Sequence, residues 1–256
     1  MKVVILAGGL GTRISEESQF KPKPMIEIGG MPILIHIMKI YAAHGFKDFI
    51  ILLGYKGYLI KEYFKNYFLH NSDFEVNLKN NKITMFNSLS VDWKVKLIDT
   101  GLKTDTGGRI KRIRRFLKKD ENFFLTYGDG LSDVDLKKEL SFHLKHKKLA
   151  TICAVKPAGR YGVLELNNAS VTGFVEKPKG DDVWINGGFF VLNEKIIDYI
   201  DSDHSSFEDV VLNKIIKDNQ LIAYTHKGFW QAMDTLRDNR DLDKKWTNGK
   251  AEWKIW

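Results

Sequence analysis

A glycine-rich segment near the N-terminus, Gly8-Gly-Leu-Gly-Thr-Arg13, is the first group of residues whose types and spacing suit chemistry. Glycines let the backbone approach a ligand closely, their free N–H groups form a nest for phosphate oxygens, and Arg13 adds a charged fork. The segment is not a dinucleotide fingerprint, because Ile14 replaces the third glycine, and it lacks the Gly-Lys-Ser/Thr of a P-loop. It predicts phosphate binding; an ordinary turn with a solvated arginine is the alternative.

Two lysines alternate with prolines in Lys21-Pro-Lys-Pro24, shortly after the glycine-rich segment. Prolines hold the backbone extended and stiff, which fixes the directions of the lysine side chains. A lysine ammonium is a compact charge suited to a triphosphate. Beside the glycine-rich segment the lysines predict a phosphate contact, whereas alone they would indicate a surface loop with solvated side chains.

Two aspartates are candidates for binding a metal ion. Asp129 lies between glycines in Tyr127-Gly-Asp-Gly130 at the end of a predicted strand, and Asp234 lies in Gln231-Ala-Met-Asp-Thr235. Open α/β sheets bind ligands at the carboxyl ends of their strands, and two carboxylates with phosphate oxygens suit Mg²⁺. The alternatives are an Asx-type turn for Asp129 and a helix N-cap for Asp234. The metal site requires that the two carboxylates converge in space.

A second anion site is indicated by Glu176-Lys177-Pro178, with Asn186-Gly-Gly188 shortly after. Lys177 leaves a strand with a proline behind it and could bind an anion. Glu176 and Asn186 could form hydrogen bonds with hydroxyl groups. Solvated charges at a strand end are the alternative interpretation of these residues.

The elements that must position these residues follow from the hydrophobic pattern. Strands are predicted at 2–7, 48–53, 83–86, 95–99 and 123–127, and helices at 32–45, 58–68, 109–118 and 134–146. Strands at 150–155, 162–166, 171–175 and 184–192 follow with only short turns, then helices at 194–200 and 207–218, a strand at 221–225 and a helix from 236. This order predicts an α/β fold: a Rossmann-like, mostly parallel central sheet flanked by helices, with a small β-rich insertion and C-terminal helices.

Composition excludes several classes of protein. The 256 residues are 43% hydrophobic and 28% charged, which is typical of a globular chain, and the single cysteine, Cys153, excludes a disulfide framework and a cysteine-based zinc cluster. No apolar run reaches the roughly 18 residues that would cross a bilayer, and the run 3–7 is too short for a signal peptide. We therefore expect a cytoplasmic protein without a membrane partner. The net charge of +8 favours anionic partners.

Taken together, the four motifs resemble those of the sugar-1-phosphate nucleotidylyltransferases, from Met1 to the tryptophan-rich tail. Ile14-Ser-Glu-Glu17 after Arg13, Gly54-Tyr-Lys-Gly57, Thr106-Gly-Gly-Arg109 and Gly228-Phe-Trp-Gln231 are most similar to the cytidylyl branch of that family, whereas Phe207-Glu-Asp-Val-Val211 replaces a stretch that usually carries Glu-Pro. The resemblance implies transfer of CMP from CTP to glucose 1-phosphate with Mg²⁺, as an early step towards CDP-linked deoxysugars of surface polysaccharide. Uridylyl or thymidylyl transfer is the alternative.

The sequence has no internal repeat, low-complexity segment or linker, which predicts one domain, and the resemblance assigns its residues to substrates. Its parts would be a nucleotide-binding part (1–150), a sugar-phosphate-binding part (151–235) and a C-terminal helix and tail (236–256). The nucleotide would contact Leu6, Ala7, Gly8, Gly9, Leu10, Gly11, Thr12, Arg13, Lys23, Thr104, Arg109 and Gly128. The sugar phosphate would contact Gly162, Glu176, Lys177, Asn186 and Gly187, and Asp129 and Asp234 would bind Mg²⁺. Arg13, Lys23, Asp129, Lys177 and Asp234 would be catalytic.

A nucleic-acid-binding protein is the alternative from a different class, because Arg109-Ile-Lys-Arg-Ile-Arg-Arg115 is strongly basic. However, Ile110, Ile113, Phe116 and Leu117 recur at helical spacing, which predicts one buried face and a solvated basic face. No zinc-finger, RNP or helix-turn-helix pattern accompanies the charge, so we expect no nucleic-acid partner. A catalytically silent regulatory relative is disfavoured by the intact candidate catalytic residues.

Three tryptophans, Trp246, Trp253 and Trp256, lie near the C-terminus. Packing in the core is one interpretation. Tryptophan is enriched at protein interfaces, so we favour a subunit interface and expect a homo-oligomer.

Overall fold

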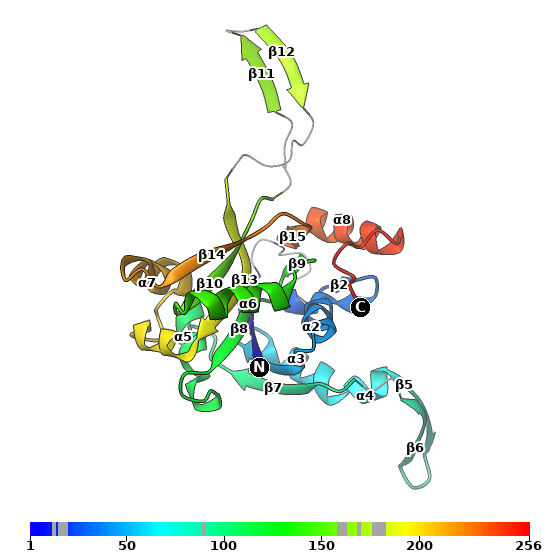
Figure 1. Cartoon of the computed structure of the whole chain (residues 1–256). Coiled ribbons are helices and arrows are strands. Elements are labelled where there is room, and N and C mark those ends of the chain that lie inside the picture. Colours follow the sequence, from blue (N-terminus) through cyan, green and yellow to red (C-terminus); the bar gives the residue numbers. More distant parts are fainter. Residues whose placement is uncertain (12–13, 15–19, 89–90, 158–162, 168–169, 176–182) are drawn as a thin grey trace.

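The computed structural model describes residues 1–11, 14, 20–88, 91–157, 163–167, 170–175 and 183–256. Its centre is a seven-stranded sheet (Figure 1). In spatial order the strands are β14 (Leu221–His226), β10 (Ala150–Val155), β13 (Ile185–Asn193), β8 (Asn122–Tyr127), β1 (Lys2–Ala7), β4 (Asp48–Leu53) and β7 (Lys94–Asp99). Only β13 runs antiparallel to its neighbours in this sheet. The predicted α/β fold with a mostly parallel sheet is confirmed.

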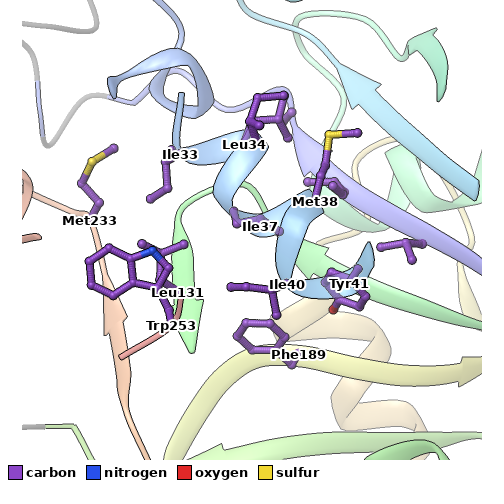
Figure 2. Close-up of a cluster of buried hydrophobic side chains, with 14 of the residues drawn as sticks. Ile33, Leu34, Ile37, Met38, Ile40, Tyr41, Leu131, Phe189, Met233 and Trp253 are labelled. Atoms are coloured by element: carbon purple, nitrogen blue, oxygen red, sulfur yellow. The ribbon is translucent and has the colours of Figure 1, made fainter. Parts of the chain in front are cut away.

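Both faces of the sheet are covered, which explains why inner strands such as β1 and β4 are continuous apolar runs rather than alternating ones. The edge strands β7 and β14 are only partly buried. One face packs against α2 (Ile33–Ala43), α6 (Leu136–His146) and α8 (Leu236–Thr247), and Figure 2 shows the side chains of α2 in this core. The other face packs against α5 (Thr106–Lys111), the 3₁₀ helix η4 (Glu194–Tyr199), the π-helix η5 (Phe207–Leu212) and α7 (Asn213–Lys217). The described helices include none long and apolar enough to cross a bilayer.

Shorter elements connect these layers. They are the 3₁₀ helices η2 (Lys23–Met25) and η3 (Arg114–Phe116), α3 (Gly57–Lys65), α4 (Tyr67–His70), and the paired strands β2 (Glu27–Ile28) with β3 (Met31–Pro32), β5 (Ser72–Asn77) with β6 (Lys82–Ser88), β9 (Gly130–Ser132) with β15 (Trp230–Ala232), and β11 (Val163–Asn167) with β12 (Ser170–Val175). The β5–β6 and β11–β12 hairpins project from the body of the molecule (Figure 1).

The predicted basic helix at 109–118 differs from the structure, in which α5 begins at Thr106 and the chain turns into η3. Gly107 and Gly108 lie inside α5 rather than before it. A Cβ atom on Gly108 would lie 2.5 Å from the Asp203 carbonyl oxygen, and one on Gly107 would lie 2.5 Å from that of Ser205. The glycines are therefore required for close packing of α5 on the segment that leads to η5.

Trp253 is fully buried within the chain. Its Nε1 donates to His36 Nδ1 at 3.3 Å, while His36 Nε2 bonds the Ile28 carbonyl oxygen at 2.9 Å. Burial lowers the pKa of His36 to about 4, so this histidine is neutral at pH 7. The expectation of a subunit interface is therefore wrong for Trp253, which packs in the core beside α2 (Figure 2).

Candidate active site

Three charged residues from distant parts of the sequence meet at one place. Lys23 Nζ donates to Asp129 Oδ2 at 2.6 Å and to Asp234 Oδ1 at 2.8 Å. The three side chains are 11%, 27% and 17% exposed, in the order Lys23, Asp129, Asp234. Solvent screens such a half-buried cluster only partly, so each carboxylate strongly favours a cation between them.

The short strands β9 and β15 bring the two aspartates together. β9 follows Asp129 directly, and it pairs antiparallel with β15, which ends two residues before Asp234. Beyond the pair, Met233 N donates to the Asp129 carbonyl oxygen at 2.9 Å. Backbone pairing thus fixes the separation of the two carboxylates.

Asp234 is not the N-cap of α8, although that was its alternative interpretation. Thr235 is the N-cap, and it forms a capping box with Asp238 through both backbone N–H groups. The carboxylate of Asp234 is consequently available to interact with Lys23. The Asx-type turn proposed as the alternative for Asp129 likewise does not account for its bond to Lys23.

Lys23 is positioned by the prolines on either side. Pro22 is extended, as predicted, but Lys23–Met25 form one turn of 3₁₀ helix rather than an extended segment. Pro24 packs against Gly128, where a Cβ atom would lie 2.9 Å from Pro24 Cγ and 3.0 Å from the Leu6 carbonyl oxygen. Gly128 N also donates to that carbonyl at 3.0 Å. The absence of a side chain at Gly128 therefore lets η2 reach the end of β8.

The glycine-rich turn begins at the end of β1, where Leu6 and Ala7 are buried. Gly11 has a φ of +67°, which favours glycine, and Ile14 N donates to its carbonyl oxygen at 3.1 Å. Around Gly9 there is open space, and the Leu10 side chain is exposed. The described part of the turn thus presents backbone at the carboxyl edge of the sheet.

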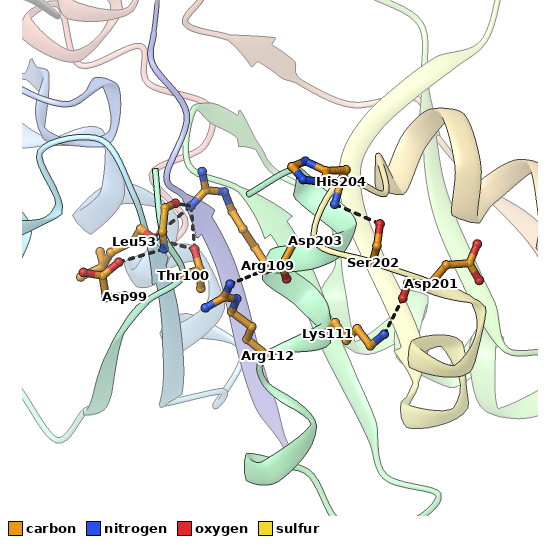
Figure 3. A network of polar contacts seen from close by, with 11 residues as sticks. Leu53, Asp99, Thr100, Arg109, Lys111, Arg112, Asp201, Ser202, Asp203 and His204 are labelled. Atoms are coloured by element: carbon orange, nitrogen blue, oxygen red, sulfur yellow. Dashed lines mark hydrogen bonds and ion pairs between the residues drawn. The ribbon is translucent and has the colours of Figure 1, made fainter. Parts of the chain in front are cut away.

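The side chain of Arg109 is buried and lies against Gly8 of this turn. Figure 3 shows it beside Leu53 and Thr100. Its Nη1 donates to the Leu53 carbonyl oxygen at 3.1 Å, to Thr100 Oγ1 at 2.6 Å and to the Gly101 carbonyl oxygen at 2.8 Å. A Cβ atom on Gly8 would collide with the guanidinium group. Burial lowers the pKa of Arg109, an effect that Asp105 partly opposes. Arg109 therefore joins the end of β4 to the segment 100–101 and packs against Gly8. Its contact with a nucleotide stays a prediction, as does that of Thr104, which is buried beside Gly101.

Three further basic residues of the run, Lys111, Arg112 and Arg114, are bonded to the segment 194–203. Lys111 Nζ donates to the Asp201 carbonyl oxygen at 2.8 Å, Arg112 pairs with Asp203 at 2.5 Å, and Arg114 pairs with Glu194 at 3.7 Å. Figure 3 shows the first two of these contacts. The expectation of a solvated basic face holds for these exposed side chains and is wrong for Arg109, which is buried.

Asn186 and Gly187 follow Ile185, the first residue of β13, and lie near the end of β8. Asn186 is exposed; its Oδ1 accepts from Gly188 N at 2.8 Å and its Nδ2 donates to the Tyr127 hydroxyl at 3.4 Å. The Gly187 carbonyl oxygen accepts from Trp230 Nε1 at 2.7 Å. The Tyr127 hydroxyl donates in turn to Glu208 Oε1 at 2.5 Å.

Sequence reasoning did not select Glu208 or Trp230 as site residues, and it quoted Tyr127 only as part of a motif. Nothing in their spacing marks them, because each is brought to the site by sheet pairing or by the η5 segment. Five predicted residues, Thr12, Arg13, Gly162, Glu176 and Lys177, lie outside the described residues.

A divalent cation fits the donor set at Lys23. Two carboxylate oxygens already converge on one positive charge, and oxygen donors are those that Mg²⁺ prefers. Among the described residues, no group of three or more His, Cys, Asp or Glu side chains could hold a metal ion. A cation held by the two aspartates would therefore complete its coordination with phosphate oxygens and water.

The fold, with Lys23, Asp129 and Asp234 clustered at the edge of the sheet, is that expected of a nucleotidyltransferase. The family model described as nucleotidyl transferase matches residues 2–248, and the chain belongs to that family. The predicted family resemblance is confirmed.

Full-length relatives make the likeness more specific. The chain is 54% identical to the glucose-1-phosphate cytidylyltransferase of Salmonella typhimurium over 256 residues, which are 100% of both chains. It is 41% identical to a probable glucose-1-phosphate cytidylyltransferase of Bacillus subtilis, again over 100% of both. Among solved structures, HddC from Yersinia pseudotuberculosis superposes with a TM-score of 0.70 and 28% identity over 96% of this chain and 99% of that one.

Proposed function

We propose that this nucleotidyltransferase transfers CMP from CTP to α-D-glucose 1-phosphate, giving CDP-glucose and pyrophosphate. The observation that carries the chemistry is the convergence of Asp129 and Asp234 on Lys23. The choice of CTP and glucose 1-phosphate is supported by the 54% identity to a glucose-1-phosphate cytidylyltransferase.

In the proposed reaction a phosphate oxygen of the sugar phosphate attacks the α-phosphorus of CTP. A new P–O bond forms as the bond between the α-phosphorus and the bridging oxygen of pyrophosphate breaks. The attacking phosphate is already ionised at pH 7, so no general base or protein nucleophile is needed. The obstacles are repulsion between two polyanions and in-line alignment, and both are reduced by fixed cations and hydrogen-bond donors.

The residues of this chain would divide that work. Asp129 and Asp234 would hold Mg²⁺, which supplies positive charge to the phosphate oxygens. Lys23 would donate to the α-phosphate, and the backbone of Gly8 to Gly11, with Arg109 packed against Gly8, would receive the base and phosphates together with Thr12 and Arg13. Lys177 would bind the sugar phosphate, and Glu176, Asn186 and Gly187, with Gly162 beside them, would contact glucose.

A pyrophosphate-release assay tests the proposal. The purified protein is incubated with Mg²⁺, with CTP, UTP, dTTP, ATP or GTP, and with a panel of hexose 1-phosphates. We expect release to be fastest with CTP and glucose 1-phosphate and to stop when EDTA removes the metal. A preference for UTP or dTTP would contradict the assignment as a cytidylyltransferase and indicate uridylyl or thymidylyl transfer instead. Absence of release with every pair, together with retention of DNA or RNA on a filter at physiological salt, would contradict the proposal as a whole.

The proposed substrates are soluble metabolites, and on that ground we propose a cytoplasmic location and no membrane or nucleic-acid partner. The ion pairs of Arg112 with Asp203 and of Arg114 with Glu194 support the absence of a nucleic-acid partner, because they balance part of the positive charge of this run within the chain. We also propose a homo-oligomer, for which light scattering coupled to size-exclusion chromatography is the direct test.

A further inference from the structure

The carboxylate of Glu208, in η5, accepts hydrogen bonds from hydroxyl groups on two other segments. Tyr127 donates to Oε1 at 2.5 Å, and Thr106 donates to Oε2 at 2.6 Å. The Ser206 hydroxyl lies 3.3 Å from Oε2 and 3.0 Å from Asp209 Oδ2, and its single hydrogen can serve only one of them. Thr106 Oγ1 in turn accepts from Phe207 N at 2.8 Å. Glu208 therefore joins the end of β8 to the beginning of α5, and the proposed reaction does not use it directly.

The bond between Tyr127 and Glu208 determines the direction of the next hydrogen bond. A carboxylate only accepts, so the single hydroxyl hydrogen of Tyr127 is directed to Glu208. Burial, and then the Glu208 carboxylate, raise the pKa of Tyr127, so the hydroxyl keeps this hydrogen. The Tyr127 oxygen is left to accept from Asn186 Nδ2.

The orientation of the Asn186 amide is thereby fixed at both ends. Gly188 N can only donate, so the atom that faces it, at 2.8 Å, is the amide oxygen. The amide nitrogen faces Tyr127 and uses one of its two hydrogens there. The second hydrogen remains on an exposed side chain at the edge of the site, where it offers a donor to an acceptor such as a sugar hydroxyl oxygen.

We propose that Glu208 is a positioning residue for sugar recognition, acting through the Tyr127 hydroxyl to keep the Asn186 amide nitrogen directed at a hexose hydroxyl. This inference rests on the proposed function, in which Asn186 contacts the sugar. Replacing Glu208 by glutamine would allow an amide N–H to face Tyr127. The tyrosine hydrogen would then turn towards Asn186 Nδ2, so that two donors oppose each other.

The experiment is a double-mutant cycle between Glu208→Gln and Asn186→Ala, with pyrophosphate release measured against glucose 1-phosphate and CTP. Loss of one oriented hydrogen bond predicts a KM for the sugar phosphate about tenfold higher in each single variant, with the KM for CTP within about twofold of wild type. The double variant should be no worse than Asn186→Ala, because the effect of Glu208 passes through Asn186. Asp218→Asn is the matched control and should resemble wild type, because Asp218 is an exposed carboxylate that also accepts from a tyrosine hydroxyl, that of Tyr199, outside this network.

Tyr127→Phe provides a second test that leaves the Thr106–Glu208 bond in place. It should raise the KM for the sugar phosphate as Glu208→Gln does. If Glu208→Gln lowers the melting temperature, its KM change could come from altered folding, and Tyr127→Phe then serves as the test of the positioning role. Effects that add in the cycle, or an equal rise in both KM values, would overturn the inference. Wild-type activity is a separate outcome: if another hexose 1-phosphate is the better substrate, the proposed sugar is wrong and the same cycle is measured with that substrate.

Discussion

Asp129 and Asp234 at the candidate site share a lysine, whereas Glu139 on α6 is fully buried and, among the described residues, neither of its carboxyl oxygens has a hydrogen-bond partner. Burial raises the pKa of Glu139 to about 8, so at neutral pH most of this group is protonated. Glu139 in turn contributes, after burial, to raising the pKa of Tyr41 on α2 and of Cys153 on β10.

This difference indicates where the chain keeps negative charge. In the core, desolvation is not compensated and the carboxyl group takes up a proton. At the edge of the sheet, Lys23 lies within hydrogen-bonding distance of both carboxylates, so each of them has a cationic partner. Acidic groups are thus paired with a cation where phosphates and a metal ion would bind, whereas the acidic group in the core has no such partner among the described residues.

The largest expected effect is on turnover. Asp129→Asn should lower turnover at saturating substrates at least about a hundredfold, because one ligand for a transition-state cation is lost, a change on the order of 3 kcal/mol. The melting temperature should change little, since Lys23 keeps its bond to Asp234. Pyrophosphate release and thermal unfolding are the two measurements. Asp241→Asn, exposed on α8, is the control, and turnover of Asp129→Asn within a few-fold of wild type would reject the metal assignment.

The sequence identifies the candidate residues of the site but does not predict how they are arranged in space. Continuous apolar runs predicted β1 and β4 with their observed bounds, and glycines beside Asp129 at a strand end predicted an exposed carboxylate. The meeting of Asp129 with Asp234 depends on β9 and β15, each three residues long. Runs of that length carry no periodicity, so the pairing that builds the site could not be predicted.

The environments of the charged residues Arg109 and Glu208 likewise could not be predicted from the sequence. Arg109 belongs to a basic run that resembles a solvated helix face, yet it is buried among backbone carbonyl groups. Glu208 lies next to Asp209, which is exposed, and the tertiary positions of Tyr127 and Thr106 distinguish the two carboxylates. Charged residues are assigned to the surface by default, so buried ones are recognised only when their acceptors and donors from other segments are in place.

The buried carboxyl group of Glu139 should cost the fold stability. Glu139→Leu should raise the free energy of unfolding at pH 7 by about 2 kcal/mol, because it replaces two buried oxygens without partners by an apolar side chain. Urea denaturation followed by fluorescence measures the change. A loss of stability instead would mean that the carboxyl group has a partner, such as an internal water molecule, and that Glu139 resembles the aspartates of the site in being compensated.

The raised pKa of Glu139 should make the stability of the fold depend on pH. The folded state retains this proton between the ordinary carboxyl range and pH 8, whereas the unfolded state releases it, so stability falls as pH rises. Between pH 7 and pH 8 wild type should lose about 1 kcal/mol more than Glu139→Gln, which cannot ionise. Identical pH profiles of the free energy of unfolding for the two proteins would show that Glu139 is ionised in the fold.

The smallest effect is expected where charges are paired but exposed. Arg112 and Asp203 are 2.5 Å apart, with side chains 42% and 47% exposed. Water already solvates both groups, so Arg112→Gln should change the free energy of unfolding by less than about 1 kcal/mol and should leave pyrophosphate release unchanged. The measurement is urea denaturation at low and high salt, since screening should remove even this difference. A decrease in the free energy of unfolding above about 2 kcal/mol that persists in high salt would mean that this pair is effectively desolvated. Exposure would then not explain why the Arg112–Asp203 pair should matter less than the cluster at Lys23.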